Sequence, residues 1–212
     1  MKLYEYFRSS ASFRVRIALN LKGITAQIVQ IHLLNNGGEQ FSPAFRAINP
    51  QARVPALMLD DGTALIQSPA ILEWLEEEYP TPPLLPPHAL ARAHVRGLAA
   101  LIACDIHPLN NTSILGYLRG PLKQDDAAVG AWARHWIETG FAALEQMVQA
   151  PFCAGDAPGL ADVYLVPQMA NARRVHTDLT QFPKLAAIEQ TCLALDAFAR
   201  ARPEAQPQFA MG

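Results

Sequence analysis

The chain has 212 residues, half of them hydrophobic and 17% charged, with a formal net charge of −2 at pH 7. This length suits two domains that each bury a core. The near-neutral charge gives no reason to expect nucleic acid or an anionic membrane as partner, so we expect small molecules or proteins. The cysteines Cys104, Cys153 and Cys192 are odd in number and widely spaced. They suggest neither a disulfide framework nor a metal site, and they fit a reducing compartment.

The sequence also predicts the compartment. No basic segment followed by an apolar run stands at the N-terminus, and no stretch approaches the roughly 18 uncharged apolar residues that span a bilayer. We therefore expect a cytoplasmic protein that does not enter the membrane.

A turn rich in hydroxyls connects the first predicted strand to the first predicted helix. Residues 3–7 are rich in aromatic side chains, as strands often are, and apolar residues recur at helical spacing from Phe13 onward. Ser9, Ser10 and Ser12 are all candidates for the N-cap. A helix N-terminus carries unpaired N–H groups and a partial positive charge, so hydroxyls there can stabilise an anion such as a thiolate. Ordinary capping is the alternative.

The remaining elements of the first half alternate between strands and helices. Gly62 supplies the positive φ that a tight hairpin turn needs. Ser68 is followed by Pro69, which predicts a helix with Ser68 as N-cap and proline in its first turn. The order predicted is β-α-β-α-β-β-α, with a strand over residues 27–32, a short helix within residues 41–48, a hairpin over residues 56–66 and the helix at Ser68.

Proline marks the predicted domain boundary. Five of the eight residues from Pro80 to Pro87 are proline, which cannot continue a helix and stiffens the chain. The expected division is therefore a first domain over residues 1–80, a linker over residues 81–87 and a second domain over residues 88–212. The polar tail from Pro203 is expected to be loose. The second domain reads as helical throughout, with helices over residues 89–118 (bent near His107-Pro108), 125–148, 160–173, 184–195 and 196–202.

This plan resembles the soluble glutathione transferases, and local motifs agree. The stretch Phe7–Arg16 resembles the signature of the zeta class, in which Ser-Ser-Cys is followed by an aromatic residue and Arg-Val-Arg. That class contains the maleylacetoacetate and maleylpyruvate isomerases. The resemblance implies a thioredoxin-like α/β domain followed by an all-α domain, glutathione as cofactor, a cis diketo acid as substrate, and a homodimer. Further matches are Asn49-Pro50 leading to Val54-Pro55, Gln67-Ser68, and residues 167–172.

The resemblance also implies residues that bind glutathione. Ser9 and Ser10 match the positions that stabilise the thiolate at the helix N-terminus. Val54 precedes a proline that is cis in thioredoxin-like folds, so its backbone can pair with the cysteinyl part of glutathione. The other matching positions are Gln67 and Ser68 for the γ-glutamyl carboxylate, and Gln40, His107, Asn111 and Ser113 for the remaining polar ends of the tripeptide.

Two arginines are candidates for the substrate, and two positions depart from the family pattern. Arg8 and Arg174 are expected to bind the two substrate carboxylates, because arginine pairs with a carboxylate bidentately. Ala11 stands where the signature has cysteine, so glutathione must supply the sulfur. Gly159 stands where the family's capping box has Ser or Thr, while Asp162 can still accept from the cap, which predicts a folding role for Asp162. All three cysteines are expected to be buried and structural.

The predicted reaction is the glutathione-dependent cis–trans isomerisation of maleylpyruvate or maleylacetoacetate, by thiolate addition, bond rotation and elimination. These substrates differ by one methylene, which a pocket distinguishes by only about 1–3 kcal/mol. One alternative is a glutathione transferase or peroxidase that acts on xenobiotics or α-haloacids; another is a non-catalytic adaptor. An isomerase differs from the first because it consumes no net glutathione. Arg92 and Arg96 are candidate charges of a dimer interface.

Overall fold

A computed structural model describes residues 1–211, which form two compact units. The first unit contains Met1–Pro83 together with the chain from Leu195 onward, and the second contains Leu84–Ala194. The sequence predicts instead that all residues after 87 belong to the helical domain. The difference lies in the C-terminal segment, which packs with the first unit.

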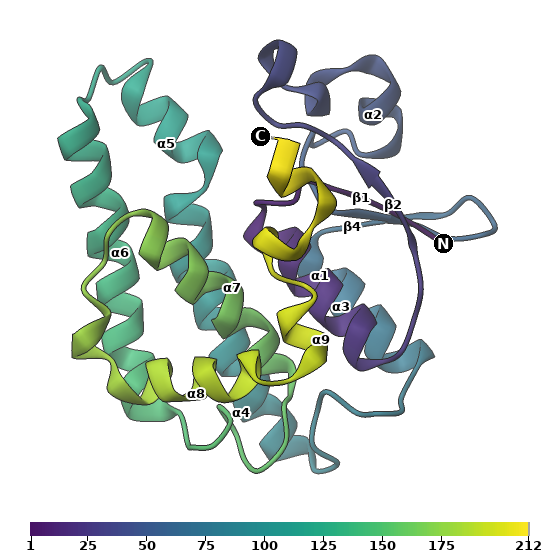
Figure 1. The fold of residues 1–212 in the computed structure, drawn as a ribbon, viewed down its shortest axis with the longest axis vertical. Coiled ribbons are helices and arrows are strands. Elements are labelled where there is room, and N and C mark those ends of the chain that lie inside the picture. The colour runs from purple at the N-terminus through teal and green to yellow at the C-terminus, as the bar shows by residue number, and fades with distance from the viewer. Residues whose placement is uncertain (212) are drawn as a thin grey trace. The chain divides into compact units, whose positions relative to one another are not determined.

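The first unit is built on a mixed four-stranded sheet with strand order β2-β1-β3-β4. β1 is parallel to β2 and antiparallel to β3, and β3 is antiparallel to β4. Figure 1 shows α1 and α3 side by side, and the two helices are in contact. This is the thioredoxin-like order expected from the sequence, with β1 (Lys2–Glu5), α1 (Ser10–Leu21), β2 (Gln27–Gln30), α2 (Pro43–Ile48), β3 (Ala56–Met58), β4 (Ala64–Ile66) and α3 (Ser68–Glu78).

Local sequence explains where these elements end. Gly23 follows α1 with φ +67°, and Gly62 has φ +88° in the hairpin turn, conformations that glycine adopts at little cost. Ser42 caps α2 by accepting from Phe45 N at 3.3 Å. The apolar faces of sheet and helices meet in a core of fully buried side chains that includes Leu3, Ile17, Leu57, Ile71, Leu72 and Leu75.

The second unit is helical, but the single bent helix expected over residues 89–118 is wrong. α4 (Ala89–Ala100) runs into a π-helical segment, η3 (Leu101–Ile106), and then a 3₁₀ turn, η4 (His107–Asn110), before α5 (Thr112–Arg119) begins. Pro108 has no N–H for an α-helical hydrogen bond, so regular winding stops there. The remaining helices are α6 (Asp126–Met147), α7 (Leu160–Arg174) and α8 (Pro183–Leu193), with a 3₁₀ turn at Leu179–Gln181.

The C-terminal segment is ordered, so the expectation of a loose tail from Pro203 is also wrong. It forms α9 (Asp196–Ala199) and two 3₁₀ turns, Pro203–Ala205 and Pro207–Met211. Phe198 is fully buried, and α9 contacts α1, beside which the yellow end of the ribbon runs in Figure 1. Burial of aromatic and proline side chains holds this polar-looking segment in place.

Within residues 1–211, no helix is both long enough and apolar enough to cross a membrane.

Candidate active site

The register of the sheet brings several predicted motifs to one edge, the edge that is formed by the ends of the strands. Tyr4 at the end of β1 pairs with Ala56 at the start of β3, and Ala56 pairs with Ile66 at the end of β4. Because neighbouring strands here are antiparallel, the end of β1, the start of β3 and the end of β4 coincide. The segments that continue from this edge are Arg8–Ser10, Val54-Pro55 and Gln67-Ser68.

The N-terminus of α1 carries the serine cluster. Ser9 is the N-cap, and its Oγ accepts from Ser12 N at 3.2 Å, so Ser9 does serve as an ordinary cap. A serine hydroxyl that accepts a hydrogen bond still has its own proton to donate. Ser10 begins the helix and is buried, while the buried Ser12 Oγ has no hydrogen-bond partner among the described residues. This end of α1 therefore offers hydroxyls and a partial positive charge to an anion.

The Val54-Pro55 peptide bond is cis, as the resemblance predicts. The loop before it is organised by Asn49, whose side chain is almost fully buried. Asn49 Nδ2 donates to Arg53 O at 2.6 Å, and its Oδ1 accepts from Gln51 N at 3.0 Å. Anchored in this way, the backbone at Val54 lies just before β3, where a peptide-like ligand can pair with it.

The start of α3 differs from the prediction that Ser68 caps the helix. The N-cap is Gln67, which has φ +70° and an exposed side chain whose Nε2 donates to Gln51 Oε1 at 2.5 Å. Ser68 is instead the first helical residue and is buried, and its Oγ accepts from Arg14 Nη1 at 3.4 Å. Turning Gln67 outward through its positive φ leaves Ser68 on the inner side of the helix.

Arg14 is the residue of this site that the sequence analysis missed. Its side chain is only 2% exposed and meets the first turn of α3. A guanidinium there adds positive charge beneath the backbone N–H groups of that turn. The sequence contains a signal for this burial, because Arg14 stands among apolar residues at the start of a helix. A charged side chain that is buried there needs a polar partner.

Gln40 lies in the 3₁₀ turn Glu39–Phe41 that follows β2. Its Nε2 donates to Leu33 O at 3.4 Å, while its Oε1 is buried and has no partner among the described residues. The amide packs against Gly38, where an added Cβ would lie 2.5 Å from Nε2 and where φ is +104°. A buried acceptor without a partner fits a donor supplied by a ligand.

Arg8 is exposed at the turn between β1 and α1, next to two aromatic rings. Its guanidinium carbon lies 5.3 Å from the ring centroid of Phe7 and 5.9 Å from that of Phe209. Both distances are within the range of cation–π attraction.

In the second unit, three glutathione-binding candidates follow one another at the break between η3 and α5. His107 begins the 3₁₀ turn and is half-buried, and Asn111 caps α5, with its Oδ1 accepting from Ser113 N at 3.3 Å. The cap leaves the amide Nδ2 of Asn111 able to donate. Trp132 fixes the turn by donating from Nε1 to Leu109 O at 2.7 Å. The binding roles of these three residues stay predictions.

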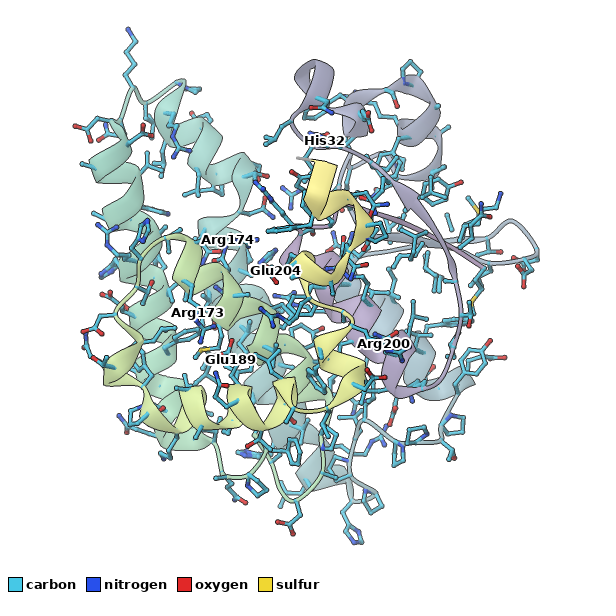
Figure 2. The ribbon with its side chains drawn as sticks, in the orientation of Figure 1. His32, Arg173, Arg174, Glu189, Arg200 and Glu204 are labelled. Carbon is cyan, nitrogen blue, oxygen red and sulfur yellow. The ribbon has the colours of Figure 1, made fainter. Side chains whose placement is uncertain are left out.

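Arg174 is the last residue of α7 and is exposed. Its neighbour Arg173 forms a bidentate ion pair with Glu189 of α8, and Figure 2 shows the two side chains pointing toward one another. Glu189 is almost fully buried, and its hydrogen bonds raise the pKa of Arg173 above the usual arginine value. The end of α7 that carries Arg174 is thus tied to α8.

The start of α7 supports the expected folding role of Asp162. Its Oδ2 accepts from Gly159 N at 2.9 Å and its Oδ1 accepts from Cys153 N at 2.8 Å, and burial raises the pKa of its carboxyl. Burial also raises the thiol pKa of Cys153 and of Cys192. The expectation that all three cysteines are buried is wrong for Cys104, which lies on the exposed side of η3.

The thioredoxin-like unit and the motifs at its sheet edge define a glutathione transferase, and the family model for the N-terminal domain of glutathione S-transferase matches residues 8–78. A curated maleylpyruvate isomerase from a Ralstonia species is 51% identical over 99% of this chain and 100% of its own length. The maleylacetoacetate isomerase of Pseudomonas aeruginosa is 50% identical, with 98% of each chain covered. The chain belongs to the zeta class of glutathione transferases, the family of these isomerases.

Solved structures agree with this assignment. The structure of a maleylpyruvate isomerase in its holo form, described as a bacterial zeta-class enzyme, has a TM-score of 0.94 and 51% identity, and covers 98% of this chain and 99% of that one. A maleylacetoacetate isomerase from Methylobacterium extorquens AM1, solved with malonate and glutathione, has a TM-score of 0.93 and 42% identity, with 98% of each chain covered.

Proposed function

We propose that this protein is a glutathione-dependent isomerase that converts the cis double bond of maleylpyruvate or maleylacetoacetate to the trans form. One observation carries the proposal: full-length relatives near 50% identity have these activities, and the same motifs converge at one sheet edge of this chain. Glutathione fits this edge, because two buried oxygen atoms in the segments that follow β1 and β2, Ser12 Oγ and Gln40 Oε1, have no hydrogen-bond partner among the described residues. A bound tripeptide can supply such partners.

The cofactor supplies a thiolate that adds reversibly to the substrate, so that the former double bond becomes a single bond free to rotate before elimination. The residues of the chain bind and orient. Ser9 and Ser10 donate hydrogen bonds to the sulfur at the N-terminus of α1, which lowers its pKa and keeps it ionised at neutral pH. Val54 pairs with the cysteinyl backbone, as the cis Pro55 beside it allows.

The ends of the tripeptide are assigned to the other candidates. Gln67 and Ser68 bind the γ-glutamyl carboxylate at the first turn of α3, where Arg14 strengthens the positive field. The remaining polar ends are assigned to Gln40, His107, Asn111 and Ser113.

Arg8 and Arg174 bind the two carboxylates of the diketo acid. Addition of the thiolate places negative charge on the carbonyl oxygen conjugated with the double bond, and a nearby guanidinium stabilises that charge more than the neutral carbonyl. A cation that is already held in place accelerates the reaction without reorganising during it.

Absence of a thiol at the turn gives the proposal its sharpest test. Ala11 stands at the signature cysteine position, and hydroxyls at neutral pH are poor nucleophiles. Each cis diketo acid is mixed with the enzyme with and without catalytic glutathione, and the absorbance of the conjugated system is followed. We expect turnover only with glutathione, and no net consumption of it. Turnover without glutathione would reject its role, and stoichiometric loss of free thiol would indicate a conjugating transferase instead.

We also propose that the protein is a cytoplasmic homodimer. The family resemblance supports this, and Arg92 and Arg96, half-exposed and one helical turn apart on α4, are candidate interface charges. Sedimentation equilibrium of the wild type and of Arg92→Glu measures the association directly. A monomeric wild type would reject the proposal.

A further inference from the structure

The C-terminal segment is fastened to the first unit by hydrogen bonds from α1. Asn20 Nδ2 donates to Ala197 O, and Arg16 Nε donates to Ala201 O, both at 2.9 Å. The Arg16 side chain is 5% exposed and forms an ion pair with the fully buried Glu5. Because a buried ion pair tolerates little displacement, Arg16 holds the backbone of the C-terminal segment at Ala201 in a fixed position.

The same guanidinium also orders the turn that carries Arg8. Arg16 Nη2 donates to Phe7 O at 3.0 Å, so one side chain holds both the residue before Arg8 and the backbone of the C-terminal segment. Arg16 and Ala201 are 185 residues apart along the chain. A displacement of the C-terminal segment that moves Arg16 therefore also affects the hydrogen bond to Phe7 O, in the turn before Arg8.

From this anchor the segment continues through its two 3₁₀ turns and brings Phe209 to Arg8. The Phe209 ring meets the Phe7 ring edge-on, with centroids 6.3 Å apart and an interplanar angle of 87°. The Arg8 guanidinium is within cation–π distance of both rings. Phe209 is 40% exposed, so its position is not explained by core packing alone.

We propose that Phe209 is a positioning residue for the isomerase, which holds the Arg8 guanidinium in the orientation that binds a carboxylate of the substrate. The inference rests on the proposed function of Arg8. A free arginine side chain has several rotamers, and ordering it on binding costs free energy. Contact with aromatic rings restricts those rotamers while leaving the guanidinium N–H groups able to donate to a carboxylate.

The test compares Phe209→Leu, which keeps an apolar side chain but removes the ring, with Phe209→Trp, which restores a ring. Phe41→Leu is the matched control, because Phe41 is 52% exposed and lies 5.6 Å from the guanidinium of Arg46. Each full-length variant is also made with Arg8→Ala. The readouts are KM and kcat for the diketo acid, the Kd for glutathione, and the Kd for malonate titrated into the glutathione-loaded protein.

We expect Phe209→Leu to raise KM and the malonate Kd about two- to fivefold, the size of a partly exposed cation–π contact. Glutathione affinity is expected to stay unchanged, Phe209→Trp to recover most of the loss, and Phe41→Leu to have no such effect. With Arg8→Ala in place, Phe209→Leu should cause no further loss.

The same loss in the Arg8→Ala background, or failure of the Trp variant to recover it, would show that Phe209 acts through general packing and would overturn the proposal. An unchanged malonate Kd in Arg8→Ala would overturn it as well. If the wild type isomerises neither diketo acid, the proposed function fails, but the malonate titrations still decide whether Phe209 positions Arg8 for a carboxylate.

Discussion

The two units offer their candidate site residues in different ways. In the first unit the candidates are the backbone at Val54 and short side chains at helix starts, and buried polar contacts such as that of Arg14 with Ser68 lie beside them. In the second unit the candidates are side chains at the ends of helices, including the exposed Arg174.

The candidate groups of the two units differ in conformational freedom. Groups fixed by sheet register have little conformational freedom, so we expect the first unit to contribute mainly to glutathione binding and to the ionisation of its sulfur. An exposed arginine at a helix end can adapt to its ligand, so we expect the second unit to contribute more to binding of the variable substrate.

The largest effect is expected at the N-terminus of α1, where the capping and thiolate roles of Ser9 can be separated. Ser9→Gly keeps most of the capping stability, since glycine at an N-cap costs only a few tenths of a kcal/mol, but it removes the hydroxyl. We expect kcat to fall about 10- to 100-fold, the value of a hydrogen bond to a charged group. The pKa of bound glutathione, followed by the ultraviolet absorbance of its thiolate, should rise.

Ser10→Ala is the matched variant at the next position. We expect it to lower kcat less than Ser9→Gly does. A larger effect at Ser10 would exchange the roles of the two serines, and an unchanged thiol pKa in both variants would remove the serines from thiolate stabilisation.

Substitution of Asp162 tests whether this carboxylate stabilises the fold of the second unit. Asp162→Ala leaves the N–H groups of Gly159 and Cys153 without their acceptor, and we expect the free energy of unfolding to fall by about 1–3 kcal/mol. Urea titration of wild type and variant measures the difference. A variant as stable as the wild type would contradict the folding role.

The same pair of proteins also gives a pH dependence with a defined sign. Burial raises the pKa of the Asp162 carboxyl above its ordinary value of 3.8, so the folded state holds the proton more tightly than the unfolded chain does. The contribution of this carboxyl to stability is therefore greatest below pH 3.8 and declines as the pH rises through the raised pKa. We expect the stability difference between wild type and Asp162→Ala to shrink across that window. A difference that grows with pH would contradict the sign of the shift.

At the end of α7 we expect a smaller effect on activity from Arg174→Ala, and the neighbouring Arg173→Ala is its control. Arg174→Ala should raise KM for the diketo acid about tenfold, the loss expected for a charged hydrogen-bonding partner, without changing the calorimetric Kd of glutathione. Arg173→Ala should instead reduce stability, because it leaves the buried Glu189 without its ion-pair partner. Arg173 is itself 48% exposed, so we expect only about 1–2 kcal/mol in urea titration. Loss of glutathione binding in Arg174→Ala would assign this arginine to the first ligand instead.

The smallest effect concerns the native thiols. Cys104 is exposed, whereas Cys153 and Cys192 are buried with raised thiol pKa values, so iodoacetamide should label Cys104 alone in the native protein. Isomerase activity should be unchanged, because glutathione supplies the sulfur. Mass spectrometry of each cysteine against residual activity is the measurement. Inactivation that follows the label at Cys104 would mean that a protein thiol participates.

The elements and motifs with local signals could be predicted from the sequence. Hydrophobic periodicity and turn glycines predicted the β-α-β-α-β-β-α order, and the spacing of motifs placed Ser9, Val54-Pro55 and Gln67-Ser68 in a known family. These features can be predicted without knowledge of tertiary contacts, because each signal lies in residues that are neighbours along the chain.

Tertiary structure decided the features that depend on partners far along the chain. The buried Ser68 meets Arg14 of α1, a partner 54 residues away in the sequence. The polar tail is ordered because Phe198 is buried and Phe209 meets the Phe7 ring. Cys104 is exposed in the π-helical segment Leu101–Ile106, although its neighbours in the sequence are apolar. Burial of a charge or a ring is decided by what packs against it, and no local pattern contains that partner.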